Sequence, residues 1–152
     1  MSSNWIILIP EDPTFVPLPD RQAKAVERFR EIAPGSMEIK AISSEQLRFV
    51  FSGANFSRVI CPACGADVDT EWWWKKMDQD YDPVTGFTLS LHVFPCCARE
   101  GTLQDLIYDW PQGFAMFSLE AYNPEIGMLI ETYMHEFENI LGCPLRVIYR
   151  HV

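Results

Sequence analysis

The sequence predicts an α+β fold, with two main helices on one face of a mainly antiparallel sheet. Residues 21–33 and 124–141 each repeat apolar side chains at helical spacing, which gives both segments one apolar stripe. Short apolar or alternating segments of strand length lie before, between and after them. The order is strand, helix, two strands, a cysteine-bearing segment, and then strand, helix, strand. A ferredoxin-like core with the cysteine segment inserted in its middle is one way to arrange these elements.

The first half of the chain contains the first helix and three strands. Asp20 is a suitable N-cap for the helix, and Pro34 followed by Gly35 is a typical helix end. One short apolar strand precedes the helix, and two strands joined as a hairpin through residues 43–45 follow it. We expect these strands at residues 4–9, 37–42 and 47–51.

The second half carries short elements around the cysteines and one long helix. Thr102 and Asp105 form a capping-box pattern, which predicts a helix that ends near residue 110. Asn123 followed by Pro124 is a strong helix start, and Gly142 ends the long helix. We also expect strands at residues 56–60, 86–94, 114–121 and 145–151, and a short helix at residues 69–77.

Length and hydropathy limit the classes of protein that fit. The 152 residues match a single domain, residues 1–152, in which residues 56–110 form an inserted segment that carries four of the five cysteines. The apolar run at residues 5–9 is too short for a signal peptide or a membrane span. We therefore expect a cytoplasmic protein that does not associate with a membrane.

The net charge of −9 is concentrated in the middle of the chain. Residues 60–138 hold fourteen acidic and three basic side chains, a net charge of −11, which argues against nucleic acid as a partner. The acidity either serves solubility alone or forms a surface that docks a basic protein partner. The spacing of Asp78, Asp80 and Asp82 is that of the first ligands of an EF-hand calcium loop. Pro83 stands where this loop needs glycine, so we expect an acidic surface turn here and not a calcium site.

Four of the five cysteines form two pairs, Cys61 with Cys64 and Cys96 with Cys97. In the sequence C-P-x-C-G the two thiolates face one point, so the two pairs together predict a structural site for one zinc ion with four thiolate ligands. His92 is the alternative ligand, because imidazole also binds zinc and adjacent cysteines reach one ion only from a kinked backbone. Buried reduced thiols and a redox-active pair are the two remaining explanations of the cysteines.

The segment Cys61-Pro-Ala-Cys64-Gly65, entered from a strand, resembles the knuckle of zinc-ribbon proteins. Together with the later Pro95-Cys96-Cys97, it also resembles an uncharacterised bacterial protein family of unknown function. This resemblance implies a bound zinc ion and a fold, and it implies no activity. The second pair departs from the standard ribbon, which repeats C-x-x-C, because its cysteines are adjacent.

Trp72, Trp73 and Trp74 are consecutive, so they cannot all face one side of a helix. At least one should be exposed or cover the zinc site, and an exposed tryptophan is a candidate contact for a protein partner. We therefore expect a small zinc-stabilised binding or regulatory protein, rather than an enzyme, whose acidic, tryptophan-bearing surface contacts another protein. The alternatives are a metal-dependent enzyme with a pocket beside an open zinc position, and a zinc-ribbon nucleic-acid binder, which needs a basic surface.

Overall fold

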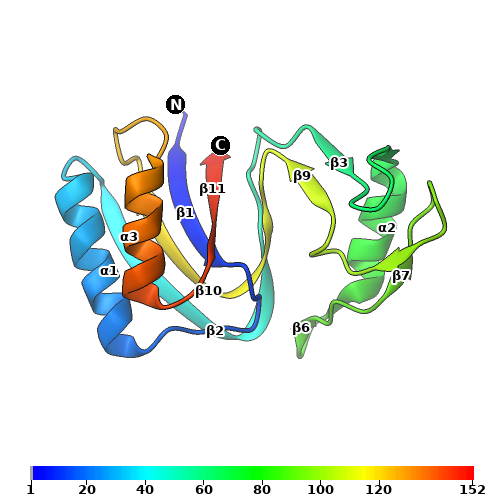
Figure 1. The fold of residues 1–152 in the computed structure, drawn as a ribbon, viewed down its shortest axis with the longest axis horizontal. Helices are drawn as coiled ribbons and strands as arrows, with labels where there is room; N and C mark the ends of the chain where they lie inside the picture. The colour runs from blue at the N-terminus through cyan, green and yellow to red at the C-terminus, as the bar shows by residue number, and fades with distance from the viewer. Residues whose placement is uncertain (1) are drawn as a thin grey trace.

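Four long strands form the antiparallel sheet at the centre of the protein (Figure 1). The computed structural model describes residues 2–152. The strands are β1 (Asn4–Pro10), β2 (Glu38–Val50), β10 (Gly113–Tyr122) and β11 (Leu145–His151), and they lie in the order β11-β1-β10-β2. Each neighbouring pair is antiparallel. The helix α1 (Pro19–Ile32) connects β1 to β2, and α3 (Glu131–Leu141) connects β10 to β11. The predicted α+β class is confirmed, and the strand order is that of a ferredoxin-like core.

Both helices cover the same face of this sheet (Figure 1). Phe29 of α1 and Phe137 of α3 are fully buried, with their ring centroids 5.1 Å apart. They pack on Phe117 and Leu119 of β10, which are also fully buried. The helix α1 begins with Pro19 at its first position, so Asp20 lies in the first turn and is not the N-cap that the sequence predicted.

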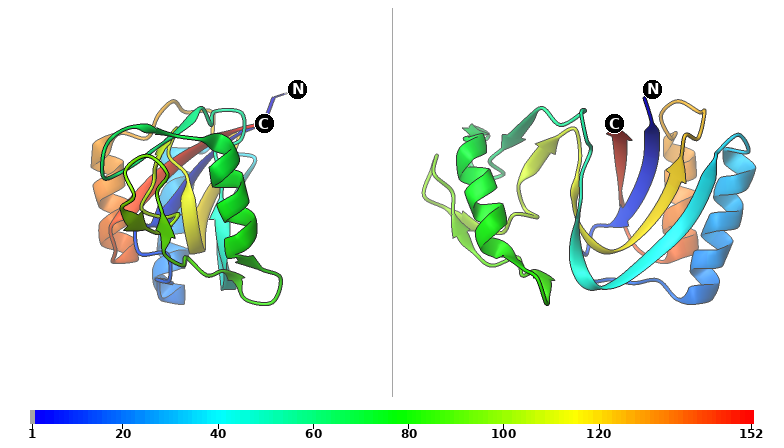
Figure 2. Two further views of the ribbon diagram at one scale, coloured as in Figure 1. Left: turned by 90° about the vertical axis from the view of Figure 1, so that its right-hand side faces the viewer. Right: turned by 180° about the vertical axis from the view of Figure 1, so that it is seen from behind.

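The opposite face of the sheet packs against the curved ends of β2 and β10, which are the two longest strands. Both β2 and β10 curve strongly away from the helices (Figure 2), and the register of the pair shifts between Ala115 and Phe117, where residues 44–47 of β2 stand opposite Met116 alone. Beyond this shift, Val50 and Ala115 pack with Ile7 and Ile148 of the central strands. The same face also buries Ser118 and Glu120, whose side chains are joined by a hydrogen bond from the Ser118 hydroxyl to the Glu120 carboxylate.

The segment between β2 and β10, residues 51–112, forms a second body beside the sheet, which we call the cysteine module (Figures 1 and 2). Its longest element is the helix α2 (Thr70–Asp80), which Asp69 caps by accepting a hydrogen bond from the Glu71 N–H. Its strands are β3 (Arg58–Ile60), β4 (Asp67–Val68), β5 (Tyr81–Asp82), β6 (Gly86–Phe87), β7 (His92–Val93), β8 (Glu100–Gly101) and β9 (Ile107–Asp109).

Short pairings and one shared apolar core hold the cysteine module together. The strands pair as β4-β3-β9, as β7-β8 and as β5-β6, and β6 reaches the main sheet through Leu47 of β2. Trp73 is buried at the centre of the module with Tyr108. Because Leu47 and Phe114 belong to the same cluster, this core continues into the curved ends of β2 and β10.

The predicted hairpin at residues 37–51 is wrong, because these residues form the single strand β2. The sequence at residues 43–45 has no glycine or asparagine to make a tight turn. Instead, β2 pairs with β10 at residues 38–43 and 48–50, and Leu47 between them pairs with Gly86, so the two halves of β2 belong to one sheet and do not pair with each other.

The predicted helix at residues 102–110 is also wrong. Asp105 accepts hydrogen bonds from the Thr102 N–H and hydroxyl, and its own N–H donates to the Thr102 carbonyl, which closes one isolated turn. The chain then enters β9, which pairs with β3. The predicted strand at residues 86–94 is divided into β6 and β7, because the residues between them bend around the buried carboxylate of Asp80.

The long helix begins later than the sequence predicted, at Glu131 instead of Pro124. Asn123 and Glu125 have positive φ angles of 44° and 57°, which helical residues do not adopt. The Asn123 side chain accepts a hydrogen bond from the Asn4 N–H and does not cap the helix. The predicted end is confirmed: Gly142 adopts the left-handed conformation, and its N–H donates to the Glu138 carbonyl. Within residues 2–152 no helix has both the length and the apolar character required to cross a membrane.

Candidate metal centre

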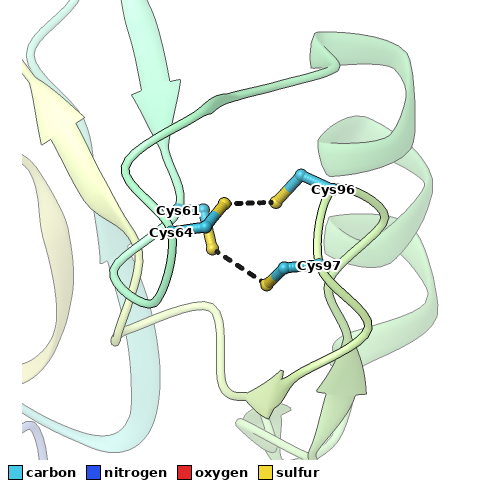
Figure 3. Close-up of side chains that lie close together, drawn as sticks. All are labelled: Cys61, Cys64, Cys96 and Cys97. Carbon is cyan, nitrogen blue, oxygen red and sulfur yellow. Dashed lines mark hydrogen bonds between the residues drawn. The ribbon is translucent and has the colours of Figure 1, made fainter.

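Cys61, Cys64, Cys96 and Cys97 meet at one point of the cysteine module (Figure 3). Their four Sγ atoms all lie within 4.8 Å of one another, with 3.8 Å between Cys61 and Cys97 and 3.3 Å between Cys64 and Cys96. Four thiolates around one zinc ion at about 2.3 Å form a tetrahedron whose sulfurs are about 3.8 Å apart. The predicted cluster is therefore present, and its spacing fits a single tetrahedral ion.

The first cysteine pair lies on a tight loop that follows β3. The Cys61 N–H donates to the Ala66 carbonyl at 2.9 Å, and the Gly65 N–H donates to the Cys61 carbonyl at 3.0 Å. Gly65 has a φ of +76°, the left-handed conformation that allows the loop to close. The Ala63 N–H points at the Cys61 sulfur, 3.4 Å away, and such donors stabilise a thiolate.

The second pair lies on a loop with the same hydrogen-bond pattern, between β7 and β8. The Phe94 N–H donates to the Arg99 carbonyl at 2.8 Å, and the Ala98 N–H donates to the Phe94 carbonyl at 3.0 Å. Ala98 has a φ of +62° and so matches Gly65 of the first loop. We call the two loops the first and second knuckles, residues 61–66 and 94–99.

The shared pattern aligns the two knuckles residue by residue. Cys97 occupies the fourth position, as Cys64 does in the first knuckle, and Phe94 occupies the first position, as Cys61 does. Cys96 stands at the third position, so the first knuckle presents thiols from positions one and four and the second from positions three and four. The adjacent cysteines therefore reach the cluster from an ordinary knuckle backbone.

Phe94 places a core side chain at the knuckle position that carries a thiol in the first knuckle. Its side chain is 2% exposed and belongs to the core of the cysteine module. The ring fits against Gly101 on the neighbouring strand β8, where an added Cβ would lie only 2.5 Å from the Phe94 Cζ atom. The sequence contained a signal for this knuckle: F-P-C-C-A and C-P-A-C-G share proline at position two and a small residue at position five.

The four thiols differ in exposure and in charge. Cys61 is buried, Cys97 is half-buried, and Cys64 and Cys96 are exposed. Burial raises the pKa of Cys61, but hydrogen bonds from the Cys64 and Ala63 N–H groups and from neighbouring thiols outweigh it and lower the pKa to about 6. The hydrogen bond with Cys64 raises the pKa of Cys96 to about 12. Four thiolates at this spacing repel one another, and a bound divalent cation removes that repulsion.

His92, the alternative ligand, is not a member of the four-residue cluster. Its Nε2 atom lies 3.3 Å from Oδ1 of Asp80, and its ring packs edge-on against Trp72.

Asp80 is fully buried, which corrects the predicted surface turn at this residue. Burial raises the pKa of Asp80, but hydrogen bonds from Ser90, Leu89 and His92 outweigh it and lower the pKa. Sequence reasoning missed this buried carboxylate, which organises the chain that leads to the second knuckle.

The three tryptophans have different environments. Trp73 is 1% exposed and donates its indole N–H to the Tyr108 hydroxyl at 3.1 Å. Trp72 is half-buried, with its ring near the Lys76 ammonium group. Trp74 is 56% exposed and is the member of the triplet that presents most of its side chain to solvent.

A site of four thiolates can bind one soft or borderline metal ion and satisfy a tetrahedral coordination shell. A closed shell of this kind has no position for a water molecule, which hydrolytic zinc enzymes require. The four cysteines are therefore close enough to hold one metal ion in a shell made only of thiolates. Compared with known proteins, the chain matches no family model, no curated protein and no solved structure.

Proposed function

We propose that Cys61, Cys64, Cys96 and Cys97 bind one structural zinc ion. The observation that carries this proposal is the convergence of four Sγ atoms within 4.8 Å from two knuckles of equal backbone pattern. The donor set supports zinc, because an all-thiolate tetrahedral site suits this ion and excludes magnesium and calcium. All four ligands come from the protein, so the ion serves stability and not hydrolysis.

Zinc in this position would connect two parts of the cysteine module that are otherwise weakly joined. Cys64 and Cys96 are separated by 31 residues, and the second knuckle is held by β7 and β8, which are two residues long each. Strands of this length have little stability of their own. A metal that closes a long loop restricts the unfolded chain, and its binding energy adds to the folding energy.

We further propose that the protein binds another protein through the surface around Trp74 and acts as a binding or regulatory protein. The cysteine module carries nine acidic and four basic side chains, a net charge of −5, which supports a basic partner. Exposed tryptophan supports an interface, because such side chains provide much of the binding energy between proteins. The closed thiolate shell argues against a zinc enzyme, and the negative charge argues against nucleic acid.

The zinc proposal is tested by elemental analysis of the purified protein. We expect one zinc per chain, lost in Cys61→Ser and in Cys97→Ser and retained in His92→Ala. Cys143→Ser is the matched control, because Cys143 lies outside the cluster. A protein prepared without chelator that contains no zinc contradicts the metal assignment, and loss of zinc in His92→Ala contradicts the ligand set.

The interface proposal is tested separately, by comparing proteins captured by the wild type with those captured by Trp74→Ala. We expect a bound partner that the Trp74→Ala protein no longer retains, although it still contains zinc. A partner that binds both proteins equally contradicts the assigned surface.

A further inference from the structure

An aromatic groove lies where β2 passes into the cysteine module. It is lined by seven residues, has a volume of about 430 Å³ and contains no charged side chain. Its residues are Phe49, Phe51, Gly53, Phe56, Trp73, Trp74 and Gln112. Five of the seven are aromatic, and they come from the end of β2, the following loop and α2.

The floor of the aromatic groove is preorganised. Trp73 is held by its hydrogen bond to Tyr108, and the Phe56 ring stacks on Trp73 with centroids 5.2 Å apart. Phe49 contacts the same indole edge-on at 5.9 Å. A ligand that binds here meets rings that are already ordered, which lowers the entropy lost on binding.

The rim of the groove is exposed, whereas the lining residue Gln112 is only 1% exposed. Trp74 and Phe51 are 56% and 45% exposed. Gln112 accepts from both the N–H and the hydroxyl of Ser52, and this fixes its amide group. Within residues 2–152, neither the Gln112 NH₂ group nor the Trp74 indole N–H has an acceptor.

Two carboxylates lie on the Trp74 side of α2, next to the exposed Lys75, and the Arg150 guanidinium lies 4.5 Å from the centroid of the Phe51 ring at the rim. Glu71 and Asp78 stand three residues before and four residues after Trp74 on α2, so they share its side of the helix. Both side chains are exposed. A ligand that lies along α2 over Trp74 therefore meets these two carboxylates.

We infer that the aromatic groove binds an extended, proline-containing segment of a protein partner with basic residues beside its prolines. Proline rings pack on aromatic floors, and the polyproline II backbone leaves its carbonyls free to accept from donors such as those of Trp74 and Gln112. The carboxylates of Glu71 and Asp78 complement the basic residues. This inference rests on the proposed protein-binding function and names the chemistry of its ligand.

The test is a titration of the full-length, zinc-loaded protein, followed by tryptophan fluorescence and calorimetry. The probe is a blocked nonapeptide of three Pro-Pro-Lys repeats. Pro-Pro-Glu repeats keep the backbone shape and reverse the charge, and Gly-Gly-Lys repeats keep the charge and remove the shape. We expect the Pro-Pro-Lys peptide to bind most tightly, and Trp74→Ala to weaken it by at least about tenfold.

Leu91→Ala is the matched control, because Leu91 is an exposed apolar residue of the same module outside the groove. It should bind the Pro-Pro-Lys peptide as the wild type does. Equal binding of all three peptides overturns the inference, and so does tighter binding of a thymidine decanucleotide than of any peptide. If no peptide binds but Trp74→Ala still abolishes capture of a partner, the ligand class is wrong and the proposed function stands. If no peptide binds and Trp74→Ala captures the same partners as the wild type, the inferred ligand class and the proposed interface are both wrong.

Discussion

Phe94 occupies in the second knuckle the position that Cys61 occupies in the first. Both residues are buried, both accept from the N–H four positions later, and both donate to the carbonyl five positions later. The Cys61 side chain is one of the four clustered thiols, and the Phe94 ring packs in the core of the cysteine module. The neighbouring Cys96 supplies the thiol that Phe94 does not, so the same backbone delivers two ligands in both knuckles.

This equivalence predicts that the ligand can be moved. In the double variant Phe94→Cys/Cys96→Ala, the second knuckle would present thiols from positions one and four, as the first knuckle does. We expect it to bind one zinc ion, with the free energy of unfolding reduced by about 3 kcal/mol because the phenylalanine ring is lost from the core. Elemental analysis measures the zinc content, and the absorption spectrum of the cobalt-substituted protein reports the coordination geometry of the site.

The control for this exchange is Phe94→Ala/Cys96→Ala, which creates a similar cavity without restoring a thiol. It should not hold zinc through gel filtration. If both double variants bind metal equally well, position one of the second knuckle is not equivalent to Cys61.

Gly101 should be required for its lack of a side chain. A Cβ atom at Gly101 would lie 2.5 Å from the Phe94 ring, and this ring has little room to move inside the core. We expect Gly101→Ala to lower the free energy of unfolding by about 1–3 kcal/mol. Gly127→Ala is the matched control, because nothing lies within 4 Å of its added Cβ, and its effect should stay below about 0.5 kcal/mol. Urea unfolding of both variants measures the difference.

The parts of the fold that the sequence predicted correctly are those set by local pattern. The amphipathic stripe of α1, the left-handed Gly142 and the alternating strand β11 are visible in short windows of sequence. The first knuckle belongs to the same class, because its proline, glycine and cysteine spacing lie within five residues.

The errors arise where distant contacts decide the local structure. The strand β2 is continuous because β10, more than sixty residues away in the chain, pairs with it. The start of α3 is delayed because the Leu129 N–H donates to the Tyr149 hydroxyl of β11 and Asn123 binds Asn4. The burial of Asp80 depends on residues that fold back upon it. No local pattern contains this information.

Removal of the proposed zinc ion should loosen the cysteine module more than the sheet. Cys61 and Cys97 are part of the module core, whereas the core between the sheet and the helices α1 and α3 contains none of the four clustered cysteines. After treatment with a chelator, we expect faster amide hydrogen exchange in residues 58–109 and retained protection in β1 and β11. Added zinc should restore the original pattern, and equal loss of protection in both parts would show that the metal supports the whole fold.

Asp80 should stabilise the protein through its ionised form. The carboxylate accepts from the Leu89 N–H at 2.7 Å and from the Ser90 N–H at 2.9 Å. Asparagine at this position keeps the size of the side chain but loses the charge, so Asp80→Asn should lower the free energy of unfolding by about 2–3 kcal/mol at pH 7. Because the pKa of Asp80 is lowered in the folded protein, its contribution to stability is complete above the ordinary pKa of 3.8 and is lost as the pH falls through the folded pKa.

The stability difference between wild type and Asp80→Asn should therefore stay constant from pH 8 to about pH 5 and narrow only below about pH 4. Urea unfolding of both proteins across this range measures it, with Asp78→Asn as an exposed control on the same helix. A difference that is already shrinking between pH 7 and pH 5 would mean that another titrating group, and not the Asp80 carboxylate, holds this part of the module.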